Sequence, residues 1–105
     1  MQPQQQRTPT KRAQTVEKIR RHLFKKETDA AAQAIKALPT KLRADPEIRF
    51  LEALTLEKQG RNREAMVLAE KSVEVFDHPE PWLLLARCYR IGGFTEKCLD
   101  ACSRV

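Results

Sequence analysis

Residues 46–60, PEIRFLEALTLEKQG, and residues 79–93, PEPWLLLARCYRIGG, are two copies of one pattern. A shift of 33 residues pairs Pro46 with Pro79, Glu47 with Glu80, Leu51 with Leu84, Ala53 with Ala86, Leu56 with Tyr89 and Gly60 with Gly93. The same shift continues into the following segment, where it pairs Ala65 with Cys98 and Ala69 with Cys102. A fixed period of this length is typical of stacked helix pairs, each of which buries an apolar face against its neighbour.

Local signals on either side of the repeat predict six helices in three antiparallel hairpins, over residues 14–38, 46–76 and 79–105. Asp45-Pro46-Glu47 is a typical helix start, with a capping side chain, a proline in the first turn and an acid facing the helix dipole. Gly60 and Gly92-Gly93 mark the turns inside the second and third hairpins, and Pro39 ends the first hairpin. The sequence therefore predicts an all-α fold.

The spacing of small, aromatic and glycine residues resembles that of the tetratricopeptide repeat. The residues that match are Trp82, Leu85-Ala86, Tyr89, Gly93 and Cys98, with a plainer copy at Ala53, Leu56, Gly60 and Ala65. The resemblance covers residues 46–105 well and residues 14–45 only weakly, because the shift places Glu27 where the turn glycine should be. Ala32 and Leu23 still fall in register with Ala65 and Leu56, which keeps the first hairpin as a degenerate repeat. The resemblance implies a superhelix of three stacked hairpins, with the degenerate first hairpin as the N-terminal cap.

Length and charge limit the possible functions. The chain has 105 residues, enough for one small domain, and we expect residues 1–13 to form a flexible basic tail. It contains no long apolar run that could span a membrane or act as a signal peptide, so we expect a cytoplasmic protein. Residues 1–26 contain eight Lys and Arg residues and one acid, Glu17. A basic segment of this kind can attract a nucleic acid, an anionic membrane or an acidic protein, or can simply keep the chain soluble.

Catalytic and metal-binding motifs are not recognisable. The two histidines, His22 and His78, have no nucleophile or carboxylate in a known arrangement around them. Cys98 and Cys102 lie four residues apart, but they fall in register with Ala65 and Ala69, which favours small packing residues over a metal or redox site. We therefore expect no enzyme activity, no cofactor and no metal.

The resemblance implies that the first helix of each hairpin lines a concave groove that receives a peptide. On these helices the predicted groove residues are Arg21, Phe24, Lys25, Phe50, Leu54, Lys58, Leu83, Arg87 and Arg90. They combine apolar side chains with positive charge, so the sequence predicts a protein-binding adaptor or scaffold whose partner is an acidic segment with apolar anchors. The asparagines that grip a carboxylate terminus in one subfamily are replaced here by Leu54 and Arg87.

Two further interpretations remain open. The chain could associate with nucleic acid through a basic set consisting of Lys11, Arg12, Lys18, Arg20, Arg21, Lys25 and Lys26. It could also self-associate, because Leu99, Cys102 and Val105 belong to a last hairpin that no capping helix follows. Each apolar side chain left in water loses roughly 1.5–3 kcal/mol of the stabilisation that burial would provide.

Overall fold

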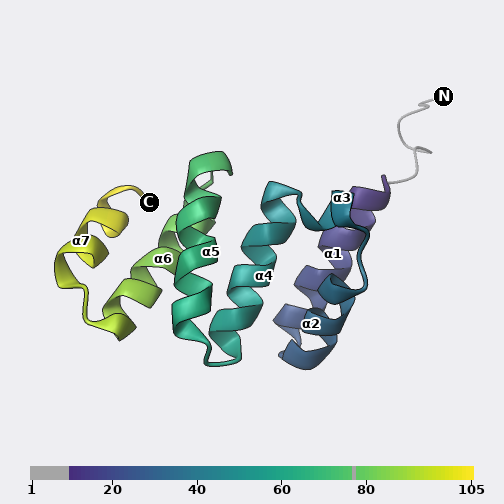
Figure 1. Ribbon diagram of the computed structural model, residues 1–105, viewed down its shortest axis with the longest axis horizontal. Helices are drawn as coiled ribbons and strands as arrows, with labels where there is room; N and C mark the ends of the chain where they lie inside the picture. Colours follow the sequence, from purple (N-terminus) through teal and green to yellow (C-terminus); the bar gives the residue numbers. More distant parts are fainter. Residues whose placement is uncertain (1–9, 77) are drawn as a thin grey trace.

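The computed structural model describes residues 10–76 and 78–105, and all regular structure in this part of the chain is helical (Figure 1). The helices are α1 (Lys11–Phe24), α2 (Thr28–Lys36), α3 (Thr40–Arg43), α4 (Pro46–Lys58), α5 (Asn62–Val75), α6 (Pro79–Gly92) and α7 (Thr95–Ser103). The predicted all-α class is confirmed. None of these helices is long and apolar enough to cross a membrane.

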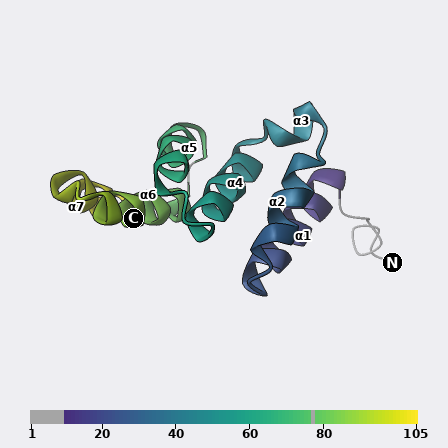
Figure 2. The ribbon, with the colours of Figure 1, turned by 60° about the horizontal axis from the view of Figure 1, so that its bottom comes forward.

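The helices form three consecutive hairpins arranged in a row. Within the hairpins α1 packs on α2, α4 on α5 and α6 on α7, while α5 packs on α6 and both α1 and α2 pack on α4. The row runs from α1 and α2 at one end to α7 at the other in both views (Figure 1, Figure 2). Its extents are 53 × 29 × 25 Å and its radius of gyration is 15.0 Å. A compact domain of 100 residues would have a radius of about 13 Å, so the molecule is elongated.

Glycines close the second and third hairpins as the sequence predicts. Gly60 and Gly93 have φ values of 81° and 83°, in the left-handed region that glycine enters without steric cost. The N–H of Arg61 donates to the carbonyl of Leu56, and the N–H of Phe94 donates to that of Tyr89 in the same way. These bonds form the Schellman motif, which satisfies carbonyls at a helix end and reverses the chain direction.

The first hairpin has the same turn, displaced by one residue from its predicted register. The left-handed residue is Lys26, with φ of 63°, and the N–H of Glu27 donates to the carbonyl of His22. Lys26 stands 34 residues before Gly60, so the prediction that Glu27 occupies the glycine position was wrong. By the same count Ala31, not Ala32, is equivalent to Ala65, and both alanines are completely buried.

The first and second turns are 34 residues apart and the second and third are 33 apart, so the first interval has one additional residue. The connection between α2 and α4 accommodates it. There Pro39 prevents α2 from continuing, because proline has no N–H and clashes with the preceding turn. Consequently α2 has nine residues whereas α5 has fourteen, and the connector forms the short helix α3. The sequence predicted a plain connector over residues 39–44, which did not anticipate this helix.

The N-terminal boundary also differs from the prediction. α1 begins at Lys11, three residues before the expected start at Gln14, because the Thr10 hydroxyl oxygen accepts a hydrogen bond from the N–H of Ala13. A capping interaction of this kind satisfies one of the unpaired donors of the first turn. Residues 11–13 are therefore helical, and the remainder of the predicted flexible tail, residues 1–9, lies outside the described residues.

One apolar core extends through all three hairpins. Its largest fully buried side chains include Ile19, Ile35, Ile48, Phe50, Leu51 and Leu84. Tyr89 is buried, and Trp82 is half-buried against the same core, as expected for residues that pack between hairpins. The phenol of Tyr89 donates a 2.7 Å hydrogen bond to Glu70 Oε2 on α5, which satisfies the one polar group of that buried ring.

Candidate functional site

The predicted groove residues lie on the first helices of the three hairpins, α1, α4 and α6, with Lys25 at the C-cap of α1. The equivalent turns at Lys26, Gly60 and Gly93 define which positions on these helices correspond. Phe24, Lys58 and Ile91 occupy one such position. Arg20, Leu54 and Arg87 occupy another, one helical turn earlier. The two rows differ sharply in exposure and in pairing.

Phe50 does not line an open groove, and this part of the prediction was wrong. Its side chain is only 2% exposed, and its ring centroid lies 6.0 Å from that of Phe76 and 6.0 Å from the Arg20 guanidinium. Phe50 belongs to the middle hairpin, which has neighbours on both sides. Its counterpart on α6, Leu83, belongs to the end hairpin and is exposed.

The row formed by Phe24, Lys58 and Ile91 is open to solvent. Phe24 is 88% exposed and Ile91 is 63% exposed, although large apolar side chains usually pack inside a protein. Lys58 is also exposed, and no ion pair between described residues includes it. The prediction did not include Ile91. The 33-residue shift that pairs it with Lys58 could have identified it.

The other exposed cations of the predicted groove are Lys25 and Arg90. In the part of the chain that the structure describes, neither forms an ion pair with a carboxylate. Lys25 directly follows Phe24 and Arg90 directly precedes Ile91. Each end of the exposed row therefore combines an apolar side chain with a positive charge that is free to meet an acidic group.

Arg21 and Arg87 are already paired. The Arg87 guanidinium donates two hydrogen bonds to the Glu57 carboxylate of α4, at 2.7 and 2.9 Å. These bonds raise the pKa of Arg87 although burial opposes the rise. Arg21 donates to Glu17 one helical turn earlier, at 2.6 Å. Leu54, between these two arginines in the array, is half-buried against the core. These three residues are therefore less available to a partner than Phe24 or Ile91.

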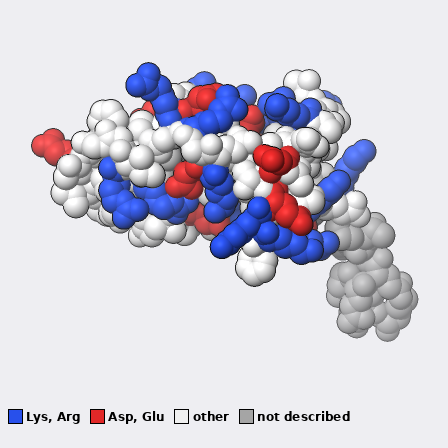
Figure 3. Space-filling model, turned by 90° about the horizontal axis from the view of Figure 1, so that it is seen from below, with Lys and Arg blue, Asp and Glu red and all other residues white. Residues whose placement is uncertain are grey.

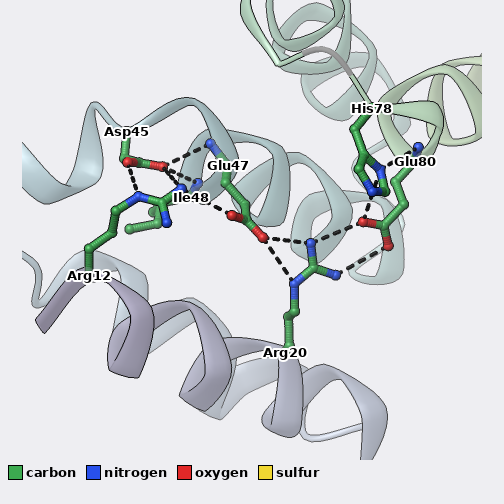
Figure 4. Close-up of polar contacts among 7 residues, drawn as sticks. All are labelled: Arg12, Arg20, Asp45, Glu47, Ile48, His78 and Glu80. Atoms are coloured by element: carbon green, nitrogen blue, oxygen red, sulfur yellow. Dashed lines mark hydrogen bonds and ion pairs between the residues drawn. The ribbon is translucent and has the colours of Figure 1, made fainter. Parts of the chain in front are cut away.

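Arg20 joins all three hairpins (Figure 4). Its guanidinium lies 2.8 Å from Glu47 Oε2 and 3.0 Å from Glu80 Oε1, in the first turns of α4 and α6. Burial by itself would lower the pKa of Arg20, but the hydrogen bonds to Glu80 and Glu47 outweigh it and raise the value. Acids at these positions also face the positive ends of their helices. The repetition of Glu47 and Glu80 at 33 residues was the sequence signal for this cluster. It did not indicate which cation pairs with the two acids.

Arg12 extends the same cluster to the start of α4. It forms ion pairs with Asp45 and with Glu47, the latter at 3.0 Å. Asp45 also caps α4 by accepting from the N–H groups of Glu47 and Ile48. Burial would raise the pKa of Asp45, but the hydrogen bonds from Arg12 and from the N–H of Ile48 hold it below its ordinary value.

These contacts separate the basic residues predicted to bind nucleic acid into a paired group and an exposed group. Arg12, Arg20 and Arg21 form ion pairs with carboxylates, while the remaining members, Lys11, Lys18, Lys25 and Lys26, are exposed. Figure 3 shows Asp and Glu side chains interspersed among Lys and Arg on the face seen from below. A phosphate backbone carries uniform negative charge, so mixed charges of this kind suit it less well than a continuous basic surface.

Of the three cysteines, Cys88 is buried and Cys98 is partly buried, whereas Cys102, which the sequence predicted to be a packing residue, is exposed. Burial raises the pKa of the Cys88 thiol to about 11, which keeps it protonated and unreactive at neutral pH. Across residues 10–76 and 78–105, no three His, Cys, Asp or Glu side chains gather closely enough to hold a metal ion.

Comparison of the chain with protein-family models, curated proteins and solved structures gave no match. The exposed row on α1, α4 and α6 and the charges around it are therefore the basis on which we infer a function.

Proposed function

We propose that this chain is a protein-interaction module of the tetratricopeptide type, acting as an adaptor or scaffold. In this proposal its partner is an acidic peptide segment with apolar anchors, held along the first helices of the hairpins. The observation that carries the proposal is the 88% exposure of Phe24 beside the cation Lys25. A large exposed aromatic side chain costs hydration free energy unless a partner covers it, and aromatic residues are common anchors at protein interfaces.

The repeat geometry supports a specific spacing of anchors. Phe24 and Ile91 hold equivalent positions on α1 and α6, with Lys58 of α4 between them in the array. Packed helices lie about 8–10 Å apart, so two steps along the row cover roughly 20 Å. An extended peptide advances about 3.3 Å per residue. The best-matched ligand therefore has two apolar side chains about six residues apart, with a carboxylate between them.

Binding through this row requires no catalytic step, and we propose a non-enzymatic role. The equivalent turns at Lys26, Gly60 and Gly93 favour a common orientation of the three hairpins, which is what a tetratricopeptide array would use to present one continuous face. Self-association through the exposed Leu99 and Val105 of the last hairpin is a separate proposal, and sedimentation at several protein concentrations tests it.

Binding of a fluorescent peptide tests the proposed face. The probe is an extended acidic peptide with two leucines six positions apart, and the variants are Phe24→Ser and Ile91→Ser. Each should weaken binding about tenfold, because an apolar anchor is worth roughly 1.5 kcal/mol or more. Val75→Ser is the matched control, since Val75 on α5 is 64% exposed but lies outside the row.

Circular dichroism should show the same helix content in all three variants, because each replaces an exposed side chain. Equal affinity for Phe24→Ser, Ile91→Ser and Val75→Ser would refute the proposed face. Preferential binding of single-stranded nucleic acid, with an affinity that falls steeply as salt increases, would instead support the basic set.

A further inference from the structure

A second groove lies between α2, α4 and α5, on residues that the exposed row does not use. Its volume is about 640 Å³, within the range of pockets that bind ligands of a few residues. None of its lining residues belongs to the predicted groove residues. The groove therefore goes beyond the function proposed above.

The groove is a space between α2 and α5, near α4, against which both of these helices pack. Its walls come from the second half of α2, the second half of α4 and the first half of α5. The groove wall contributed by α2 includes Ala32, which is small. A small side chain on this wall leaves room between the two helices.

Part of the groove lining is apolar. Leu56 of α4 and Leu68 of α5 are half-buried against the core and line it, and Val67 of α5 stands at its edge, 48% exposed. An apolar side chain inserted here would cover Val67 and contact both leucines. Burial of that side chain would supply most of the binding free energy, as expected for an anchor residue.

The charges around the groove are unbalanced. Arg43 is paired with Glu52 at 3.0 Å, and Arg61 is paired with Glu64 at 2.7 Å. These two pairs are locally neutral. Two further lining cations, Lys36 and Arg63, form no ion pair with any described residue.

We infer that this groove binds a short acidic peptide segment, with one apolar side chain against Val67 and carboxylates facing Lys36 and Arg63. The two unpaired cations favour a ligand with negative charge, and the apolar part of the lining favours a hydrophobic anchor. A nucleic acid fits less well, because Glu52 and Glu64 would repel its phosphates and the lining contains no aromatic ring for base stacking. Discrete carboxylates on a peptide can avoid those two acids.

Nuclear magnetic resonance of the full chain can distinguish the two sites. The probe is a capped peptide with one leucine flanked by glutamates, which lacks the second anchor that the exposed row requires. Titration should shift the amide signals of Leu56, Val67 and Leu68 and leave those of Phe24 and Ile91 in place. Shifts confined to Phe24 and Ile91 would overturn the assignment of this second site.

Charge-reversal variants provide the second measurement. Lys36→Glu and Arg63→Glu together should weaken binding of the same peptide about tenfold, because two attractions become repulsions. Lys71→Glu is the matched control, as Lys71 is an exposed residue of α5 outside the groove lining, and it should bind as the wild type does. Phe24→Ser should also bind this probe normally, so loss of the exposed row and loss of the groove are separable.

Two results would contradict the inference. One is an equal affinity of Lys71→Glu and the double reversal for the peptide. The other is an oligothymidine that shifts the groove amides more strongly than the peptide, which would make the ligand a nucleic acid.

Discussion

Lys26 and Gly60 adopt the same left-handed backbone conformation, with φ of 63° and 81°, at equivalent turns of the first and second hairpins. Only glycine adopts this conformation without steric cost, since a Cβ atom crowds the neighbouring carbonyl. Both turns nevertheless carry the same pair of backbone hydrogen bonds. The hairpin geometry is thus maintained at Lys26 against a local preference of its side chain.

This strain predicts opposite effects for two substitutions. Lys26→Gly should stabilise the protein and Gly60→Ala should destabilise it, each by about 1 kcal/mol, as measured by urea unfolding. A Cβ added at Gly60 meets no atom within 4 Å, so its cost arises from the backbone alone. Lys25→Gly is the control, because Lys25 has φ of −82° and gains nothing from glycine. Stabilisation by Lys25→Gly as large as that by Lys26→Gly would contradict this explanation.

The contrast between Phe50 and Phe24 gives a second prediction. Phe50→Ala should cost about 3–5 kcal/mol of unfolding free energy, because it leaves a cavity in the core. Phe24→Ala should change stability by less than about 0.5 kcal/mol, as expected for a residue that is almost fully exposed. Thermal unfolding measured by circular dichroism compares the two. A similar loss in both variants would mean that the Phe24 ring is packed in solution.

The ion pairs of Arg20 should be measurable as a coupling. Arg20→Met and Glu80→Gln, made singly and together, form a double-mutant cycle in which we expect an interaction free energy of roughly 0.5–1 kcal/mol. The value is modest because both side chains are about a third exposed. It should decrease as salt increases, since ions screen exposed charges. A coupling of zero at low salt would show that the contact adds no stability.

Asp45 predicts a loss of stability in acid. Its pKa is lowered in the folded chain from the ordinary value of 3.8, so folding favours the charged form. This contribution is complete above the unfolded pKa and is lost as pH falls through the folded pKa. Asp45→Asn keeps a capping oxygen but cannot ionise. The variant should therefore be less stable than the wild type at neutral pH and nearly equal to it in strong acid, by thermal unfolding. A difference that is independent of pH would assign the effect to the cap alone.

The parts of the fold that depend on local chemistry were predictable from the sequence. Helices begin at Pro46 and Pro79, because proline fixes a φ angle that suits the first helical turn. The chain reverses direction at Gly60 and Gly93, because glycine enters the left-handed region without steric cost. Lys26 was not recognisable as a turn residue, since lysine has no preference for the left-handed region. Its identification required the hydrogen bond from the N–H of Glu27.

The candidate site was predictable only in part. The helical positions of Phe24 and Leu83 indicated exposed apolar residues, whereas Phe50, in the same register as Leu83, is covered by its neighbours. Burial of this kind depends on which hairpins lie on either side, and a repeat pattern does not distinguish the middle copy from an end copy. The groove between α2 and α5 was not predicted for a related reason, because it depends on how two helices that both pack on α4 lie relative to one another.

Arg20 of α1 reaches Glu80 of α6, so the first and last hairpins touch one another across the middle one. In most linear repeats each unit responds only to the adjacent ones, and fraying at one end is not felt at the other. Here a local opening of either terminal hairpin removes a contact from its distant counterpart. Native-state hydrogen exchange at the two extremities of the chain should consequently be correlated, with neither extremity opening wholly independently of the other.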